Sequence, residues 1–405
     1  MGADSPAKGP AESAGRVPGG AVRAFALLTA AVAAGIAVFF ALYSLLPVTR
    51  PDAPELGSLF TGAMMAFVMA VQAFVPALVR RWSLRLVLVL ALILLGVGAL
   101  LSGSASGPAL LMPGAALSGI GFGAIVVVGT QGVALFVPGA SLGRALGVYG
   151  LVTLLASAFG SPAGVQLALV LSPEVFGVGA AALCAVSAAA ASRLPAGAGR
   201  EPGRAGVPGR VRAVPWRGRL SGVPIGVLAF LLVSVLLLSH GLSSFAVLGS
   251  DAAGAALAIF CVQLGNAIGR WLGGELERWL PAGVAWVLVA GCVAVAAAAG
   301  VLVPGLAAVV VCGLLLGAGI GAVQTVTLHA VLRRLEAGRA SVVWNLTVDA
   351  GLWAGGVGWG IALSAGRAVP AVVTVSCVAL LLGLVLAVRA RRADVTGASR
   401  RRRMP

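Results

Sequence analysis

The sequence predicts an all-α membrane protein whose twelve transmembrane helices form two pseudo-symmetric six-helix bundles, with both termini in the cytoplasm. Composition is the first reason: 60% of the 405 residues are hydrophobic and only 10% are charged, which excludes an ordinary soluble domain. Polar breaks divide the chain into twelve apolar segments, each long enough to cross a hydrocarbon core of roughly 30 Å. The distribution of basic residues and an internal repeat are the other two reasons.

The predicted spans follow one another with short loops. They cover approximately residues 22–46, 57–79, 86–103, 109–135, 145–170, 173–192, 221–247, 252–274, 282–302, 304–332, 340–364 and 369–389. The predicted domains are therefore an N-terminal bundle at 22–192 and a C-terminal bundle at 220–390. Residues 1–21, rich in Gly, Pro and Ala, are expected to be disordered. Residues 193–219, with seven Arg and four Pro, are expected to be a flexible cytoplasmic linker, and residues 391–405 form a basic cytoplasmic tail.

Basic residues predict the orientation of these spans. If the N-terminus is cytoplasmic, 26 of the 28 Lys and Arg lie on that side, and only Arg50 and Arg367 lie outside. Lys and Arg near span ends are retained on the cytoplasmic face. The net charge of +16 is therefore attributed to topology and anionic headgroups, and no nucleic-acid partner is expected. The five Cys lie inside apolar segments without metal-ligand spacing, so no disulfide or metal site is expected.

Short motifs recur between the two halves of the chain. Gly-Ile-Gly-Phe-Gly-Ala at 119–124 has a counterpart at 317–322, Gly-Arg-Ala at 143–145 recurs at 338–340, and Val71-Gln72 matches Val262-Gln263. All three offsets lie between 191 and 198 residues and join each span to the sixth span after it. This predicts a duplicated six-helix unit. The spaced glycines are expected to allow close contact between helices.

Polar side chains distinguish eight spans from the other four. Every Gln and Asn lies inside a predicted span, and none lies in the third, sixth, ninth or twelfth. A polar group in a bilayer is costly unless it faces other helices or water, so we expect the other eight spans to line a polar cavity. The candidate cavity residues are Tyr43, Gln72, Gln131, Gln263, Gln324, Trp344 and Asn345. Further candidate walls are Phe39, Phe40, Phe67 and Trp353, for which lipid contact or core packing is the alternative.

Asp349 is the acid predicted to lie deepest in the membrane. It follows Arg339 by ten residues, which places it about 15 Å into the core, near the middle. A medium of low dielectric favours the neutral form of a carboxyl group, so reversible protonation is plausible there. We predict that Asp349 carries a coupling proton or meets a cationic substrate; a structural hydrogen bond to a neighbouring helix is the alternative. His329 and His240 are further candidates for proton relay.

Taken together, the spans, the related halves, the long central loop and the order of polar helices resemble the major facilitator superfamily, over about residues 22–390. That family has a loop motif, Gly-x-x-x-Asp-Arg-x-Gly-Arg-Arg, between its second and third spans. Residues 76–85 occupy the corresponding place here; they retain basic residues of the motif but lack its Asp and both of its Gly. Residues 270–278 hold a shortened version, and residues 143–164 are similar to a Gly- and Pro-rich signature of the drug:proton antiporter branch. The resemblance implies gating or helix-bending roles for Arg80, Arg81, Arg144, Gly160, Pro162, Gly164, Glu277 and Arg278.

The resemblance also implies a function. It indicates secondary active transport by alternating access, with proton-coupled efflux of a small amphipathic or drug-like molecule or secondary metabolite, and a link to drug resistance. The expected partners are the lipid bilayer and a small-molecule substrate, with the proton gradient as energy source, no bound cofactor and a monomeric protein. The excess of Arg over Lys, 27 to 1, suggests a GC-rich bacterial genome and hence a bacterial plasma membrane.

Other functions remain as alternatives at this point. An importer or uniporter of a small metabolite would have the same architecture. A polytopic membrane enzyme, such as a lipid-linked transferase, would need a cluster of catalytic groups, and Asp349 stands alone among deep acids. A non-transporting sensor or assembly factor is the third alternative. No enzymatic activity is expected.

Overall fold

The computed structural model describes residues 19–49, 54–104, 107–199, 224–248, 252–280, 282–302 and 305–401. In these ranges every regular element is helical. The first half contains α1 (Gly19–Thr49), α2 (Pro54–Gln72), α3 (Val75–Trp82), α4 (Leu84–Gly103), α5 (Pro108–Phe136), the 3-10 turn η1 (Gly139–Ser141), α6 (Leu142–Leu171) and α7 (Pro173–Ala191). The second half contains α9 (Ile225–Leu248), α10 (Ala252–Trp279), α11 (Ala282–Leu302), α12 (Leu306–Leu332), α13 (Ala337–Ser364) and α14 (Ala368–Arg401).

Local sequence signals mark several helix starts. Ser83 and Ser172 cap α4 and α7, because their hydroxyls accept hydrogen bonds from the backbone N–H groups of Leu86 and Val175. By length and composition, seven of the described helices are able to cross a membrane, or eight if α2 and α3 form one bent span. Each predicted span falls on a described helix, or on α2 and α3 together for 57–79. That all twelve cross the membrane stays a prediction.

The second predicted span differs from a single straight helix. It breaks between Gln72 and Val75, and α2 and α3 meet at an angle of 55°. The cause is Pro76, which lacks the N–H that would bond the carbonyl of Gln72 and whose ring clashes with that turn. Phe74 takes over as the N-cap of α3 and its carbonyl accepts from Ala77 and Leu78. The break therefore ends α2 at Gln72, a predicted cavity residue.

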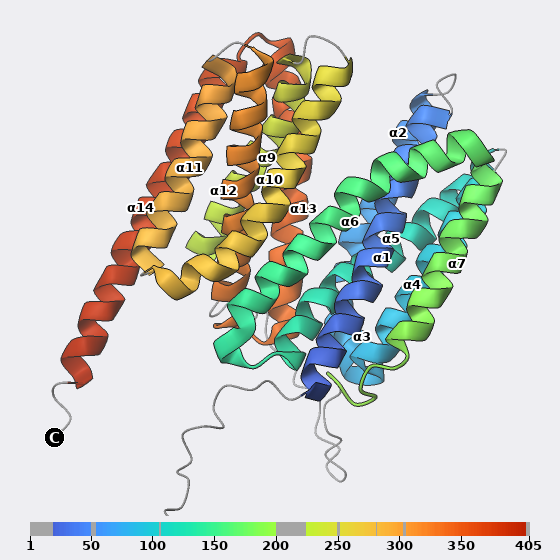
Figure 1. The fold of residues 1–405 in the computed structure, drawn as a ribbon, viewed down its shortest axis with the longest axis horizontal. Coiled ribbons are helices and arrows are strands. Elements are labelled where there is room, and N and C mark those ends of the chain that lie inside the picture. Colours follow the sequence, from blue (N-terminus) through green and yellow to red (C-terminus); the bar gives the residue numbers. More distant parts are fainter. Residues whose placement is uncertain are drawn as a thin grey trace, which may run out of the picture.

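The helices form two bundles, α1 to α7 and α9 to α14 (Figure 1). Helix pairing is equivalent in both. In the first bundle α1 packs on α6, α4 on α5 and α7, and α2 on α5; in the second α9 packs on α13, α11 on α12 and α14, and α10 on α12. These pairs are related by the same step of six predicted spans that relates the sequence motifs. The exact bounds of the two domains stay predictions.

The repeated glycines lie where helices approach most closely. On α5, Gly119 and Gly123 face the backbone of α2 at Met64 and Val68. On α12, the matching Gly317 and Gly321 face the backbone of α10 at Val262 and Asn266. At all four glycines a Cβ atom would overlap the neighbouring carbonyl oxygen, so no larger residue fits without moving a helix. The predicted role of these glycines in close helix contact is therefore confirmed.

Candidate functional site

The two bundles contact each other mainly at one end of the molecule. We call this end the basic end (Figure 1). It contains the first residues of α1, the whole of α3, the junction between α5 and α6, and the last residues of α14. The contacts between bundles join α6 with α10 and α12, and α2, α3 and α5 with α13. In the described chain α4, α7, α11 and α14 contribute no extensive contact between bundles. These four helices correspond to the third, sixth, ninth and twelfth predicted spans, which contain no Gln or Asn.

Exposure along one face of α13 shows where the interface ends. Asn345, Asp349 and Trp353 follow one another at steps of one helical turn. Asn345 is 8% exposed and its amide nitrogen lies 3.4 Å from the Thr130 hydroxyl of α5. Asp349 is partly exposed, and Trp353 is 65% exposed. The N-terminal bundle thus covers this face of α13 at the basic end and leaves it uncovered from about Asp349 onward.

Asp349 is held at that boundary by the N-terminal bundle. The Nε2 amide of Gln72 donates a hydrogen bond to its Oδ2 atom at 2.7 Å. Gln72 is fully buried at the break that ends α2, and within the described residues its Oε1 atom has no hydrogen-bond partner. The bond joins residues 277 positions apart and connects the two bundles. A hydrogen bond to an ionised group is stronger than one between neutral groups.

A second polar group surrounds Arg270 on α10. Its Nε donates to Oε1 of Gln324 on α12 at 2.7 Å, and its guanidinium carbon lies 5.3 Å from the centre of the Trp344 ring. Trp344 itself is 2% exposed and donates from Nε1 to the Thr327 hydroxyl. Gly150 of α6 packs against this side chain, because a Cβ atom there would overlap the aliphatic carbons of Arg270. In the part of the chain that the structure describes, no carboxylate is ion-paired with Arg270. An amide oxygen and an aromatic face therefore compensate this cation instead.

An ion pair closes the interface at the basic end. Nε of Arg144, at the start of α6, lies 3.0 Å from Oε1 of Glu275 on α10. Next to it, a Cβ atom on Gly274 would meet the carbonyl oxygen of Gly143, so the two backbones are in direct contact. Arg144 is 63% exposed and Glu275 is 21% exposed. Such exposed pairs contribute about 0–1 kcal/mol, so this pair adjusts the closure without fixing it.

We expect Glu275→Gln to shift the bundles toward a state in which the basic end is open. Loss of an exposed pair worth at most about 1 kcal/mol would change the ratio of states by up to about fivefold. Spin-label distances between the basic ends of α3 and α13 would measure that ratio. The charge-swapped double variant Arg144→Glu with Glu275→Arg is the control, because it should restore the original ratio. An unchanged distance distribution in Glu275→Gln would show that the pair does not contribute to closure.

Three other predicted cavity residues differ in placement. Gln131 is buried beside Gly338, where α13 begins, so it belongs to the closed part of the interface. Gln263 on α10 is partly buried, and Tyr43 on α1 is partly exposed. Among the aromatic candidates, Phe39 is a core residue, because it is buried and stacks on Phe122 with ring centroids 3.7 Å apart. Phe40 packs edge-on against that same ring, whereas Phe67 and Trp353 are exposed.

The residues predicted to gate or bend helices are also separated by the structure. Gly160 and Gly164 on α6 pack against the backbone of α1, at Ala37 and Ala41, inside the N-terminal bundle. Arg80 and Arg81 are exposed at the end of α3, and neither has an ion pair with a described acid. His329 is partly buried in the last turn of α12. The side chains of His240, Pro162, Glu277 and Arg278 lie outside the described residues.

Sequence reasoning did not include several residues that build the interface. Glu275 makes an ion pair with Arg144, and the predicted Glu277-Arg278 pair stays a prediction. Thr130 was not a candidate, and Arg270 was not among the site residues. The sequence did contain one indication: Arg270 lies within a predicted span. Burying a charged side chain in a membrane costs free energy, so an Arg at such a position usually has a functional or structural role.

The fold and the interface define a helical membrane protein of the two-bundle transporter class. Residues 24–357 match the family model described as Major Facilitator Superfamily, and the chain belongs to this family, which comprises transporters and not enzymes. It is therefore a multi-pass membrane protein. No curated protein sequence matches the chain closely enough to add a relative.

Solved structures of transporters have similar folds, and one of them, FucP, is described as a Major Facilitator Superfamily transporter. A variant of the E. coli fucose:proton symporter FucP matches with a TM-score of 0.72 and 14% identity, covering 90% of this chain and 98% of the other. FucP in the outward conformation matches with a TM-score of 0.70 and 13% identity, covering 92% and 99%. The human organic anion transporter MFSD10 (TETRAN) matches with 0.72 and 15%, covering 91% and 100%. At these identities the likeness concerns the fold alone.

Proposed function

We propose that this protein exports a small amphipathic or drug-like molecule in exchange for protons, by alternating access of the cavity between its two bundles. In this proposal the basic end is cytoplasmic, and the described conformation is closed toward the cytoplasm and open on the opposite side. The protein works as a monomer in a bacterial plasma membrane, with the proton gradient as its energy source and no bound cofactor.

The observation that carries the proposal is the hydrogen bond between Gln72 and Asp349. It joins the bundles at the boundary between the closed and the uncovered part of the interface. An ionised Asp349 accepts this bond, whereas protonation removes the charge and weakens it. A proton that arrives from the open side would therefore loosen the closure at the basic end and favour the opposite state. Loss of that proton to the cytoplasm would restore the bond, which couples one proton to one cycle.

The side chains left uncovered support the proposed substrate class. Tyr43, Phe67 and Trp353 are exposed aromatic residues on helices predicted to line the cavity. Their rings offer apolar surface, and the Tyr43 hydroxyl and Trp353 indole N–H offer hydrogen bonds, which suits a molecule that has both properties. Asp349 adds one negative charge at the boundary of the interface, which favours a substrate that is neutral or cationic.

Arg270 supports a second candidate function. A guanidinium without a carboxylate partner in the described residues could attract a small anion, and this would fit an importer or symporter of an organic anion. One similar structure is that of an organic anion transporter and another that of a fucose:proton symporter. The packing of Arg270 against Trp344 and Gln324 makes this the weaker candidate, because its Nε donor and aromatic contact are already used.

Dye accumulation in cells that express the full chain tests the proposal. Cells with the protein should contain less ethidium, a cationic amphipathic dye, than cells without it, and an uncoupler should remove the difference because it removes the proton gradient. Fluorescein, an anionic dye, serves as the matched probe for the second candidate and should not be affected. Fluorescein uptake that depends on the protein would favour the anion importer. A difference in ethidium that survives the uncoupler would contradict proton coupling.

A further inference from the structure

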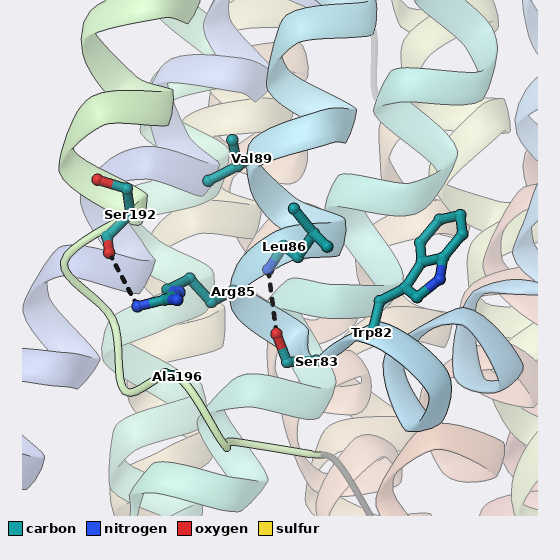
Figure 2. A pocket seen from close by; sticks show the side chains of 7 residues that line it. All are labelled: Trp82, Ser83, Arg85, Leu86, Val89, Ser192 and Ala196. Carbon is teal, nitrogen blue, oxygen red and sulfur yellow. Dashed lines mark hydrogen bonds between the residues drawn. The ribbon is translucent and has the colours of Figure 1, made fainter.

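A hollow of about 400 Å³ lies at the basic end, mainly between α4 and the chain that follows α7, and α4 and α7 make no extensive contact with the other bundle. Its lining includes Trp82 at the end of α3, Arg85 and Leu86 at the start of α4, and Ser192 and Ala196 after α7 (Figure 2). Its lining contains one cation, two serines and no acid. The transport proposal does not use these residues.

The hollow is a built feature of the fold. The chain after α7 turns back beneath α4: the buried Leu194 anchors it, and the N–H of Leu84 donates to the carbonyl of Ala198 at 2.9 Å. Ser83 makes the sharp corner between α3 and α4 with a φ of 111°. Figure 2 shows the Arg85 guanidinium reaching toward the carbonyl of Ser192, with Trp82 on the far side of Ser83. The position and shape of the hollow are therefore fixed by the backbone of the α3–α4 corner on one side and of the chain after α7 on the other.

Arg85 has hydrogen-bonding capacity to spare. A single contact is recorded for its guanidinium, from Nη1 to the Ser192 carbonyl at 3.5 Å, which is long for a hydrogen bond. No described carboxylate is paired with it. A guanidinium offers five N–H donors in a plane that matches the oxygens of a phosphate group. The hydroxyls of Ser83 and Ser192 and the indole of Trp82 are further polar groups at the hollow.

An apolar stripe continues from the hollow along α4. Its members are exposed, recur at helical spacing and run away from the basic end; they are Leu86, Leu90, Ile93, Val97 and Leu100. At 1.5 Å per residue the stripe is about 21 Å long, which exceeds the roughly 15 Å thickness of one leaflet's hydrocarbon. The neighbouring helix α7, packed on α4, also exposes Val178, Leu183 and Val186. The surface next to the hollow is therefore suited to acyl chains.

We propose that this hollow binds one anionic glycerophospholipid from the leaflet at the basic end. Arg85 binds the phosphate, Trp82 lies at the level of the glycerol backbone, and the acyl chains lie along the α4 stripe. A basic pocket between helices followed by an apolar surface matches the two parts of such a lipid. Trp is also the residue type preferred at the membrane–water interface. A soluble phosphate compound would use the same cation but would not use the stripe.

Thermal unfolding of the purified full-length protein in detergent tests the site. Phosphatidylglycerol should raise the unfolding temperature more than phosphatidylcholine, and Arg85→Gln should weaken the apparent affinity for phosphatidylglycerol by roughly fivefold or more. Arg81→Gln is the matched control, since Arg81 is a nearby exposed Arg that does not line the hollow. The preference for the anionic lipid is the informative readout, because loss of the Ser192 contact alone would lower stability equally in both lipids.

A second variant tests the hollow without changing charge. Ala196 is exposed, so Ala196→Trp should fill the space, leave folding intact and abolish the lipid preference while Arg85 remains. Inorganic phosphate at millimolar concentration should not compete if the ligand is the lipid. Equal loss of preference in Arg85→Gln and Arg81→Gln would overturn the proposal, because it would indicate general attraction to a basic surface. Competition by inorganic phosphate, or a normal preference in Ala196→Trp, would overturn it as well.

Discussion

Proton-driven transport by Asp349→Asn is expected to fall at least about tenfold, while exchange of substrate across the membrane without a gradient continues. Asn has nearly the same shape and its side-chain oxygen still accepts from Gln72, but as an uncharged acceptor it makes only the weaker bond of the protonated carboxyl group. It cannot take up a proton, so the gradient no longer changes the strength of that contact. Uptake of ethidium into proteoliposomes with an imposed pH difference measures the driven reaction, and dye exchange at equal pH measures the undriven one.

Two further variants make this prediction specific. Glu174→Gln is the matched control, because Glu174 is an exposed acid in the first turn of α7, away from the bundle interface, and this variant should transport normally. Gln72→Leu removes the donor, and its effect should not add to that of Asp349→Asn, since both act on one bond. Full proton-driven transport in Asp349→Asn would show that Asp349 is a structural acid and that coupling resides elsewhere.

The second large effect is expected for Gly269→Val, which should destabilise the C-terminal bundle by roughly 1–3 kcal/mol or more. Gly269 on α10 faces the backbone of Ala318 on α12, and a Cβ atom there would overlap the Ala318 carbonyl oxygen. A backbone carbonyl cannot rotate away as a side chain can. The contacting faces of α10 and α12 would therefore have to move apart. Thermal unfolding of the full chain in detergent would measure the loss, and the yield of folded protein from membranes would fall with it.

Gly291→Val on α11 is the control for that prediction. It adds the same side chain to another helix of the same bundle, but a Cβ atom at Gly291 meets nothing within 4 Å. Its unfolding temperature should stay close to that of the wild type. Equal destabilisation by both substitutions would mean that Val is disfavoured in these helices in general and that the close contact of α10 with α12 is not responsible.

Much of the fold could be predicted from the sequence because a bilayer imposes strict local rules. Apolar length and the positions of Arg are properties of the chain itself, so hydropathy predicted where the described helices lie. The break at Gln72 was missed, although Pro76 carried the signal for it. The angle of 55° between α2 and α3 depends on how these two helices pack against their neighbours. A local sequence pattern does not contain that information.

The candidate site was predicted only in part. Gln72 and Asp349 were both selected as polar residues at membrane depth, but their hydrogen bond spans 277 positions and could not be inferred from either helix alone. The same holds for the ion pair of Arg144, which forms with Glu275. Neighbouring positions on a helix point about 100° apart, so a short motif cannot tell which acid faces the other bundle. Register and face are decided by packing.

The sequence by itself determined that the chain is helical, apolar and basic at one end, because these features follow from the cost of placing polar groups and charges in hydrocarbon. Tertiary structure alone decided which polar groups meet: the packing of helices far apart in the chain brings Gln72 to Asp349 and Arg270 to Trp344. The physical reason is that the two effects act over different parts of the chain. Transfer into a membrane acts on each segment separately, whereas a hydrogen bond requires two segments to be aligned to within a fraction of an ångström.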